Sequence, residues 1–207
     1  MPHHSSKSRR IASAAQLRAL GSATRQEIVD VLGGAGASSV AQLAELMGRR
    51  PDALYFHLRL LERVGLVVAC PEEQGDTGVR YRLPVSGVTL DYAGSSRREL
   101  ARVVRLALKL SQREFERECL SGADPGTGAS RRFWGGRVVG WVDDAGLARV
   151  NELLAELHCT LRAGRPGGDR RPVSLGFLLA PSGRGERIRT STRRSRTRTK
   201  PPHKEKS

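Results

Sequence analysis

The fold of this chain is decided by the stretch Leu54-Tyr55-Phe56-His57-Leu58-Arg59-Leu60-Leu61-Glu62-Arg63-Val64-Gly65-Leu66-Val67. Its leucines at 54, 58 and 61 are spaced by four and three residues, which places them on one face of a helix. Pro51 suits the first turn of that helix, and Gly65 stops it. The apolar run that follows favours a strand. The stretch therefore predicts a helix over about 51–64 with one buried face, followed directly by a strand over 66–70.

Three further helices are predicted before this stretch. The first covers 13–20, and the second runs from an N-cap at Ser22 to about residue 32, where two glycines stop it. The third begins at Ser39 and has Gln42 three residues later, which is a capping-box pattern. Gly48 is a candidate for the end of this third helix. The third and fourth helices are therefore joined by a tight turn.

A β-hairpin is predicted after the fourth helix. Residues 71–78 are polar with two glycines and form its turn. Residues 79–83 alternate, so that Val79, Tyr81 and Leu83 share one face while Arg80 and Arg82 lie on the other. Four helices and a hairpin over 11–84 predict a winged helix-turn-helix. In that fold the second helix of the tight pair can enter the major groove of DNA.

The same segments resemble the ArsR-type winged-helix regulators. The resemblance rests on residues 17–28 (LRALGSATRQEI), 40–48 (VAQLAELMG) and, most specifically, 54–67. It implies a DNA-binding transcription regulator in which helix 51–64 reads the DNA. The groove-side candidates that it implies are Arg50, Asp52, Ala53, Tyr55, Phe56 and Arg59.

Four other residues complete the candidate DNA-binding set: Arg49, His57, Arg80 and Arg82. Arginine is a frequent partner of both guanine and phosphate. Each candidate also has a structural interpretation. The arginines could be solvated, Tyr55 could shield the edge of the core, and His57 could pack between helices or contact a phosphate.

The charge of the chain is unevenly distributed. The net charge is +15, yet residues 11–84 carry eight basic and eight acidic side chains. Residues 183–207 carry ten basic and two acidic side chains and are expected to form a disordered tail, as residues 1–10 are to form a disordered arm. A neutral domain suits DNA only if its acidic groups point away, namely Glu27, Glu45, Glu72, Glu73 and Asp76. This neutrality supports the alternative of a winged-helix module that binds proteins without sequence-specific DNA binding.

Other classes of protein find little support. The three cysteines (Cys70, Cys119 and Cys159) are dispersed, so we expect neither a disulfide framework nor a metal or cofactor site. No nucleotide-binding or metalloprotease motif is present, and we expect no enzyme. No apolar run reaches the roughly 20 residues that span a bilayer. These features predict a cytoplasmic protein with no membrane association.

Residues 90–182 are expected to form a small α/β or helical dimerisation domain, which makes the fold class mainly α with small β. Helices are predicted over 96–120 and 144–163, and strands over 138–142 and 173–179. Both helices carry apolar seams without a partner in the first domain, which favours a homodimer. Trp134 and Trp141 could pack in the core or line the pocket of a small-molecule effector. A basic stripe on helix 96–120 is a solvated face or a strip near DNA: Arg98, Arg102, Arg105, Lys109 and Arg113.

Overall fold

The computed structural model describes residues 8–11, 13–71, 78–84 and 87–182. The chain divides into two compact units, the first of Met1–Trp134 with Val142–Gly176 and the second of Gly135–Trp141 with Phe177–Ser207. The first seven residues of the predicted arm, most of the hairpin turn and the basic tail lie outside the described residues. Within the second unit, the described residues form neither helix nor strand.

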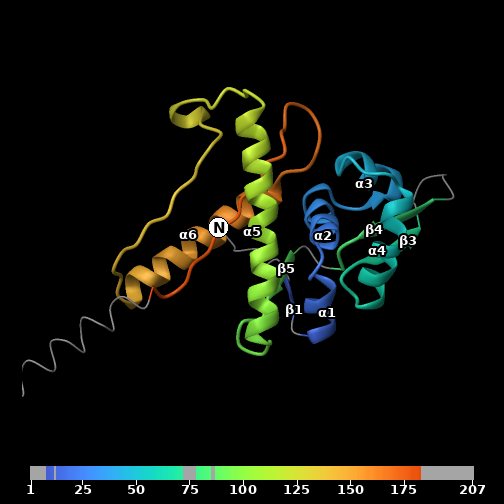
Figure 1. Ribbon diagram of the computed structural model, residues 1–207, viewed down its shortest axis with the longest axis horizontal. Coiled ribbons are helices and arrows are strands. Elements are labelled where there is room, and N and C mark those ends of the chain that lie inside the picture. Colours follow the sequence, from blue (N-terminus) through green and yellow to red (C-terminus); the bar gives the residue numbers. More distant parts are fainter. Residues whose placement is uncertain (1–7, 12, 72–77, 85–86, 183–207) are drawn as a thin grey trace, which may run out of the picture. The chain divides into compact units, whose positions relative to one another are not determined.

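Four short helices form the N-terminal half of the first unit (Figure 1). They are α1 (Ala14–Ala19), α2 (Ala23–Ala35), α3 (Val40–Leu46) and α4 (Asp52–Arg63). Ser13 caps α1 by accepting a hydrogen bond from the Gln16 amide. All four helices occur where the sequence predicts them, although α2 extends three residues beyond the expected stop. Its end is set by Gly36, whose φ of 86° a side chain would disfavour.

A small antiparallel sheet completes this half of the unit. Its strand order is β2-β4-β3, with β2 at Ser38–Ser39, β3 at Val68–Pro71 and β4 at Val79–Arg82. The predicted hairpin is therefore present, and we call β3 and β4 the wing. β3 begins two residues later than expected, because Leu66 and Val67 lie in the core ahead of it.

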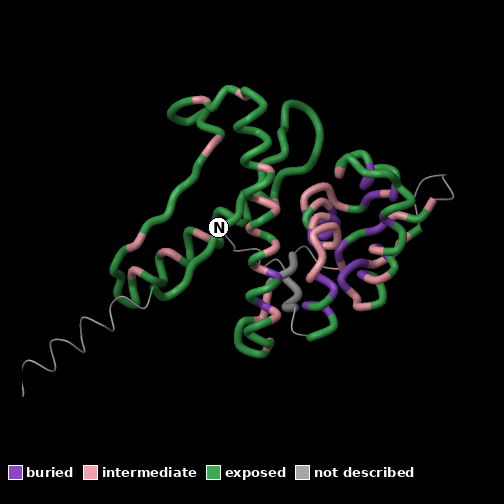
Figure 2. The backbone as a smooth tube through the Cα atoms, viewed as in Figure 1, coloured by how far each residue is buried: buried purple, intermediate pink, exposed green. Residues whose placement is uncertain are grey.

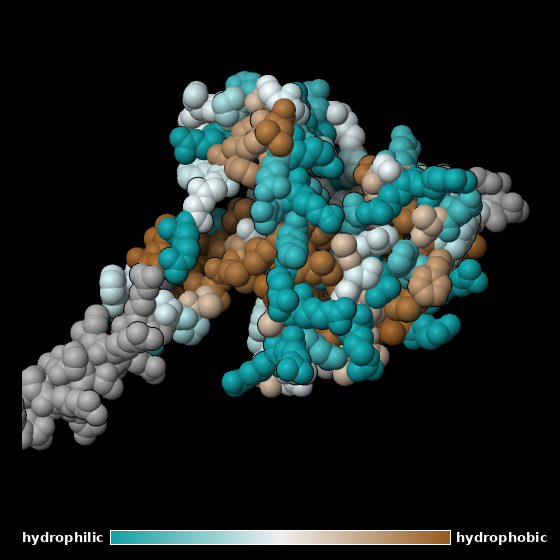
Figure 3. Space-filling view, viewed as in Figure 1, coloured by the Kyte–Doolittle hydropathy of each residue, from teal (hydrophilic) through white to brown (hydrophobic). Residues whose placement is uncertain are grey.

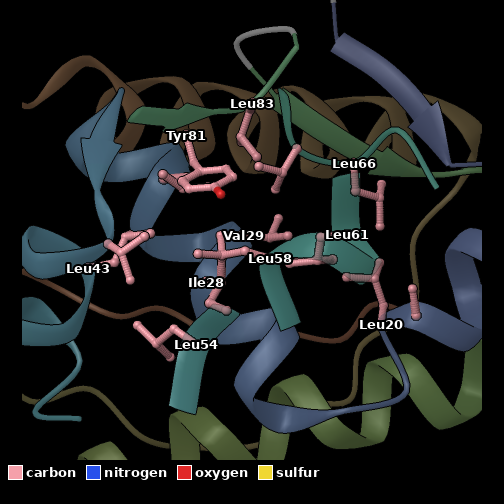
Figure 4. Close-up of a cluster of buried hydrophobic side chains, with 14 of the residues drawn as sticks. Leu20, Ile28, Val29, Leu43, Leu54, Leu58, Leu61, Leu66, Tyr81 and Leu83 are labelled. Atoms are coloured by element: carbon pink, nitrogen blue, oxygen red, sulfur yellow. The ribbon is translucent and has the colours of Figure 1, made fainter. Parts of the chain in front are cut away.

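The core is formed by apolar residues of these helices and strands. Figure 2 marks the buried positions along the backbone in purple. Leu54, Leu58 and Leu61 are all fully buried, as their spacing predicts. Figure 4 shows them directed into the same cluster as Ile28 of α2, Leu43 of α3 and Tyr81 of β4. Burying one leucine stabilises a fold by about 1.5–3 kcal/mol, so this stripe fixes α4 firmly.

The long helix α5 (Arg97–Leu120) is attached to this core, which the sequence analysis did not anticipate. Leu100 and Val103 are buried in the main hydrophobic cluster. Buried Gln26 of α2 donates from Nε2 both to the Leu20 carbonyl at 2.8 Å and to the Val103 carbonyl at 3.0 Å. The N-terminal part of the apolar seam of α5 therefore packs in the core of the winged helix-turn-helix.

A second sheet has two strands, neither of which the sequence predicts. Ser8–Ile11 forms β1 and pairs in parallel with β5 (Gly87–Leu90). Residues 8–10 were expected in a disordered arm and 87–90 in a connection. The two segments lie almost eighty residues apart in the sequence, so a local pattern could not reveal their pairing.

The remaining part of the first unit contains the short helix η1 (Gly128–Ser130) and α6 (Asp144–Ala163). Asp143 caps α6 through a hydrogen bond from the Gly146 amide at 2.8 Å. None of the residues of α6 is buried. The strands predicted over 138–142 and 173–179 are wrong, because both segments lack regular structure in the described chain. An apolar run favours a strand only where a neighbouring strand pairs with it.

Candidate nucleic-acid interface

The turn between α3 and α4 is fixed by the backbone. α3 starts with the predicted capping box, in which Ser39 and Gln42 exchange hydrogen bonds of 2.9 and 3.2 Å. It ends in a Schellman motif: the amide of Gly48 donates to the Glu45 carbonyl and the amide of Arg49 to the Ala44 carbonyl. Gly48 has a φ of 59°, in the left-handed region that glycine adopts without steric strain. This geometry makes α3 and α4 a helix-turn-helix pair.

The outer face of α4 lies opposite its buried leucines. Its residues are exposed: Asp52, Ala53, Tyr55, Phe56, Arg59 and Arg63. Four of the groove-side candidates that the resemblance implies lie near the centre of this face or beside it, with Tyr55 nearer its flank. Phe56 and Tyr55 are 64% and 45% exposed, which is unusual for aromatic side chains.

The two arginines of the turn have different surroundings. Arg49 forms an ion pair with Glu27 of α2, with 2.8 Å between Nη2 and Oε2. Arg50 lies 3.6 Å from Asp52 in a pair whose side chains are both more than 80% exposed. An exposed ion pair of this kind contributes little to the free energy of folding, so Arg50 can readily take another partner. Arg50 is therefore available to a ligand, whereas Arg49 joins the turn to α2.

On the wing, Arg80 does not project into solvent as its place in the alternating pattern predicts. Its Nη2 donates to the Ala37 carbonyl at 2.7 Å and to Gln42 Oε1 at 3.3 Å. Gln42 Oε1 is the same atom that accepts from the Ser39 amide in the capping box. Arg80 therefore connects the wing to the start of α3.

Arg82 is the exposed arginine of the wing. Its Nη1 donates a long hydrogen bond, of 3.3 Å, to the carbonyl of the next residue, Leu83. Between the two arginines, Tyr81 is buried at 8% exposure, as its alternation with them predicts. Burial raises the pKa of the Tyr81 phenol, and nearby Glu62 and Tyr55 of α4 raise it further. The wing and the outer face of α4 are thus adjacent.

His57 lies on α4 between the core and the outer face. Its ring meets that of Phe56 edge to face, with 5.7 Å between the centroids. Burial lowers the pKa of His57, and the charges of Arg25 and Arg49 lower it further. The imidazole is therefore neutral at pH 7. Nδ1 is buried and has no hydrogen-bond partner within the described residues.

The five acidic residues that the sequence analysis requires to point away from DNA fall into three groups. Glu27 is neutralised by Arg49. Glu45 is exposed on α3. Glu72, Glu73 and Asp76 of the hairpin turn lie outside the described residues.

Sequence reasoning missed three residues around this surface. Gln42 was assigned only a capping role, although it also accepts the hydrogen bond from Arg80. Arg63 is exposed on the outer face, two residues beyond buried Leu61, and helical geometry alone would have found it. Leu46 of α3 is 54% exposed, and helical spacing already places it outside the apolar face of Val40, Leu43, Ala44 and Met47.

The tryptophans do not pack in a core, contrary to the main sequence-based interpretation. Trp134 and Trp141 are about three-quarters exposed, and the guanidinium of Arg131 lies 4.7 Å from the centre of the Trp134 ring. An open cavity lies at the end of α2, between Leu32, Arg82, Leu83 and Arg165. Neither tryptophan lines this cavity, so they do not form the expected effector pocket there.

Other kinds of site are not found in the described part of the chain. Among residues 8–11, 13–71, 78–84 and 87–182, no group of three or more histidine, cysteine or acidic side chains could hold a metal ion. No helix within the same ranges has the length and the apolar composition needed to cross a membrane.

Residues 20–68 match the family model described as a helix-turn-helix domain. A search of curated protein sequences finds no match.

Solved structures with similarity include reduced HlyU from Vibrio cholerae N16961. It is 28% identical over 46% of this chain and 84% of its own, with a TM-score of 0.30. The homodimeric winged helix-turn-helix DNA-binding domain of Mb0332 from Mycobacterium bovis, described as a possible ArsR-family regulator, is 23% identical. It aligns with 50% of this chain and 83% of its own, with a TM-score of 0.28.

A third similar structure is wild-type MarR from E. coli, which is 13% identical over 69% of this chain and 87% of its own, with a TM-score of 0.31. The family match begins at the end of α1, spans α2, α3 and α4, and stops at the start of β3. Residues 20–68 of this chain therefore match a helix-turn-helix domain in sequence, in agreement with the geometry of α3 and α4, and the helix-turn-helix part of the predicted resemblance is confirmed.

Proposed function

We propose that this protein is a sequence-specific DNA-binding transcription regulator that places α4 in the major groove. The observation that carries the proposal is the exposed outer face of α4, directly after a turn fixed by a Schellman motif. An α-helix fits the width of the major groove, where each base pair presents a distinct pattern of groups. The family match over 20–68 supports the same assignment.

The residues of the interface divide into two roles in this proposal. Arg50, Ala53, Tyr55, Phe56 and Arg59 face the base edges, with Asp52 orienting Arg50. Arg82 and the exposed end of the wing contact the backbone beside the groove. Arg49, His57 and Arg80 position α3, α4 and the wing, because each is engaged with or enclosed by the protein itself.

We further propose that the protein acts as a homodimer on a pseudo-palindromic site. The apolar side chains of α6 support this, because Leu147, Leu153, Leu157 and Leu161 are all at least 40% exposed. Figure 3 shows hydrophobic side chains gathered along α6. Exposed apolar patches of this kind mark interaction surfaces, and a second copy is the occupant whose symmetry would match paired half-sites. In this proposal the protein acts in the cytoplasm, and it regulates by binding DNA without catalysing a reaction.

Selection of bound fragments from genomic DNA tests the proposal. The full-length protein is expected to enrich a common sequence and to bind it about a thousandfold or more tightly than random DNA at physiological salt. Its affinity should fall as salt rises, because phosphate contacts release counterions. Binding that is weak and equal for all sequences would contradict the proposal.

The second candidate is a protein-interaction module, and two observations favour it. Residues 11–84 have no net charge, and Phe56 and Leu46 expose apolar surface near the turn. A module of this kind would select no sequence from genomic DNA. The same selection experiment therefore separates the two functions.

A further inference from the structure

The outer face of α4 is unusual in offering apolar rather than hydrogen-bonding groups at its centre. Phe56 is two residues from both Leu54 and Leu58, which at about 100° per residue points it away from the core. The side chain is 64% exposed. Its described ring contact is the edge of His57. Ala53 beside it is also exposed.

Of the polar groups at the start of α4, Arg49 is held by α2, and the weak, exposed pair of Arg50 and Asp52 is open to a ligand. Arg49 is paired with Glu27, and Arg50 lies beside Asp52. Arg59 and Arg63 are the exposed cations that follow along the helix. The centre of the face is therefore a phenyl ring with charged side chains around it.

The major groove presents one apolar group, the C5-methyl of a pyrimidine. Thymine carries it in ordinary DNA, and 5-methylcytosine carries it in modified DNA. The other base-edge groups in this groove are hydrogen-bond donors and acceptors, with which a phenyl ring cannot pair.

We infer that Phe56 reads a pyrimidine C5-methyl group in each half-site, so that the bound sequence has a methyl-bearing base opposite this residue. The inference rests on the proposed DNA-binding function and deepens it. The ring covers the methyl group and removes both from water. Substituting the methyl group by hydrogen leaves a small void against the ring without affecting any hydrogen bond of the base pair.

The test replaces thymine by deoxyuracil, one position at a time, in the sequence selected from genomic DNA. Deoxyuracil lacks only the methyl group. At one or two positions in each half-site, the full-length parent should bind about three- to fivefold more weakly, as expected for one buried methyl group. In a second arm, cytosine is placed at the same positions with and without its 5-methyl group. The arm with the larger effect identifies the base that supplies the methyl group.

Phe56→Ala is the decisive variant. Because the Phe56 side chain is exposed, its removal opens no cavity in the core, and a thermal melt verifies that the variant folds. It should bind the methylated and unmethylated duplexes equally. The matched control is Leu46→Ala, which removes an exposed apolar side chain (54% against 64% for Phe56) from α3 and should keep the parental discrimination.

The outcomes separate this inference from the function on which it rests. Absence of any selected sequence contradicts the DNA-binding function itself. A selected sequence that the parent binds equally well with and without methyl groups overturns only the inference about Phe56. A methyl effect that persists in folded Phe56→Ala also overturns it, because another residue then makes the contact.

Discussion

At the scale of single residues, the two arginines of the wing have separable effects. Arg80 donates to Ala37 and Gln42, whereas Arg82 is exposed. Arg80→Ala should lower the free energy of unfolding by about 1.5–3 kcal/mol, the contribution typical of hydrogen bonds from a charged donor. Arg82→Ala should leave stability within about 0.5 kcal/mol of the parent. Urea unfolding of both variants measures the difference.

The same pair of variants also separates positioning from phosphate contact in DNA binding. Arg82→Ala should weaken binding to every duplex. It should also reduce the slope of log affinity against log salt concentration by about one, because one phosphate contact is lost. Arg80→Ala should leave that slope unchanged while relaxing sequence preference, because the start of α3 loses its connection to the wing. Equal stability of the two variants, or a salt slope that changes for Arg80→Ala alone, would contradict this division.

At the same scale, His57 should make the free energy of unfolding depend on pH. Its pKa in the folded protein is below the ordinary value of 6.5, so the unfolded chain takes up the proton first as pH falls. The free energy of unfolding should therefore decrease as pH drops below about 6.5, and this contribution should level off below the folded pKa. His57→Gln should lose that part of the dependence. Urea unfolding of both proteins at pH 7.5 and pH 5.5 measures this. If the free energy of unfolding changes between the two pH values as much in the variant as in the parent, His57 is not the source of the change.

At the scale of elements, two glycines with the same open surroundings should respond in opposite directions. A Cβ at Gly34 or at Gly48 would meet no atom within 4 Å. Gly48 has a positive φ, so Gly48→Ala should destabilise by about 1–2 kcal/mol. Gly34 lies within α2, where Gly34→Ala should stabilise by about 0.5–1 kcal/mol. Thermal or urea unfolding tests both. A Gly48→Ala variant as stable as the parent would show that the turn does not depend on the left-handed conformation, and a destabilised Gly34→Ala would contradict the prediction for α2.

Local patterns were sufficient for the helix-turn-helix and insufficient for what surrounds it. The spacing of Leu54, Leu58 and Leu61 and the capping box at Ser39 each act within a few residues, so the sequence predicted them correctly. The extension of α2 through Gly33 and Gly34 was missed, since packing in the core outweighs the weak helix propensity of glycine. The pairing of β1 with β5 joins distant segments, and no local period encodes it.

The candidate site shows the same limit in its side chains. The pattern places Phe56 and Arg59 on an exposed helix face, and the structure agrees. The partners of Arg80 come from the loop before α3 and from α3 itself, about forty residues earlier. Alternation predicts which face of a strand a residue occupies, but not which distant group lies above that face.

At the scale of the whole molecule, α6 determines the proposed assembly. Leu157 and Leu161 follow helical spacing and are exposed by about 40%. An exposed apolar surface on a helix favours association, because covering it releases water from apolar groups. If a second copy covers α6, negative charges introduced on that surface should separate the two copies. The winged domain should stay folded, because its core contains no residue of α6.

The variant Leu157→Glu with Leu161→Glu tests this assembly, and Ala155→Glu is its matched control on the other side of the same helix. Light scattering should give a dimer for the parent and the control, and a monomer for the double variant. Two linked half-sites bind more tightly than one, so the double variant should lose at least about tenfold in affinity for the full site while binding a single half-site like the parent. A parent that is monomeric at the concentration where it protects both half-sites would rule out α6 as the dimer interface. Half-site binding that is weaker for the double variant than for both the parent and Ala155→Glu would instead indicate that this face of α6 contributes to the DNA-binding surface.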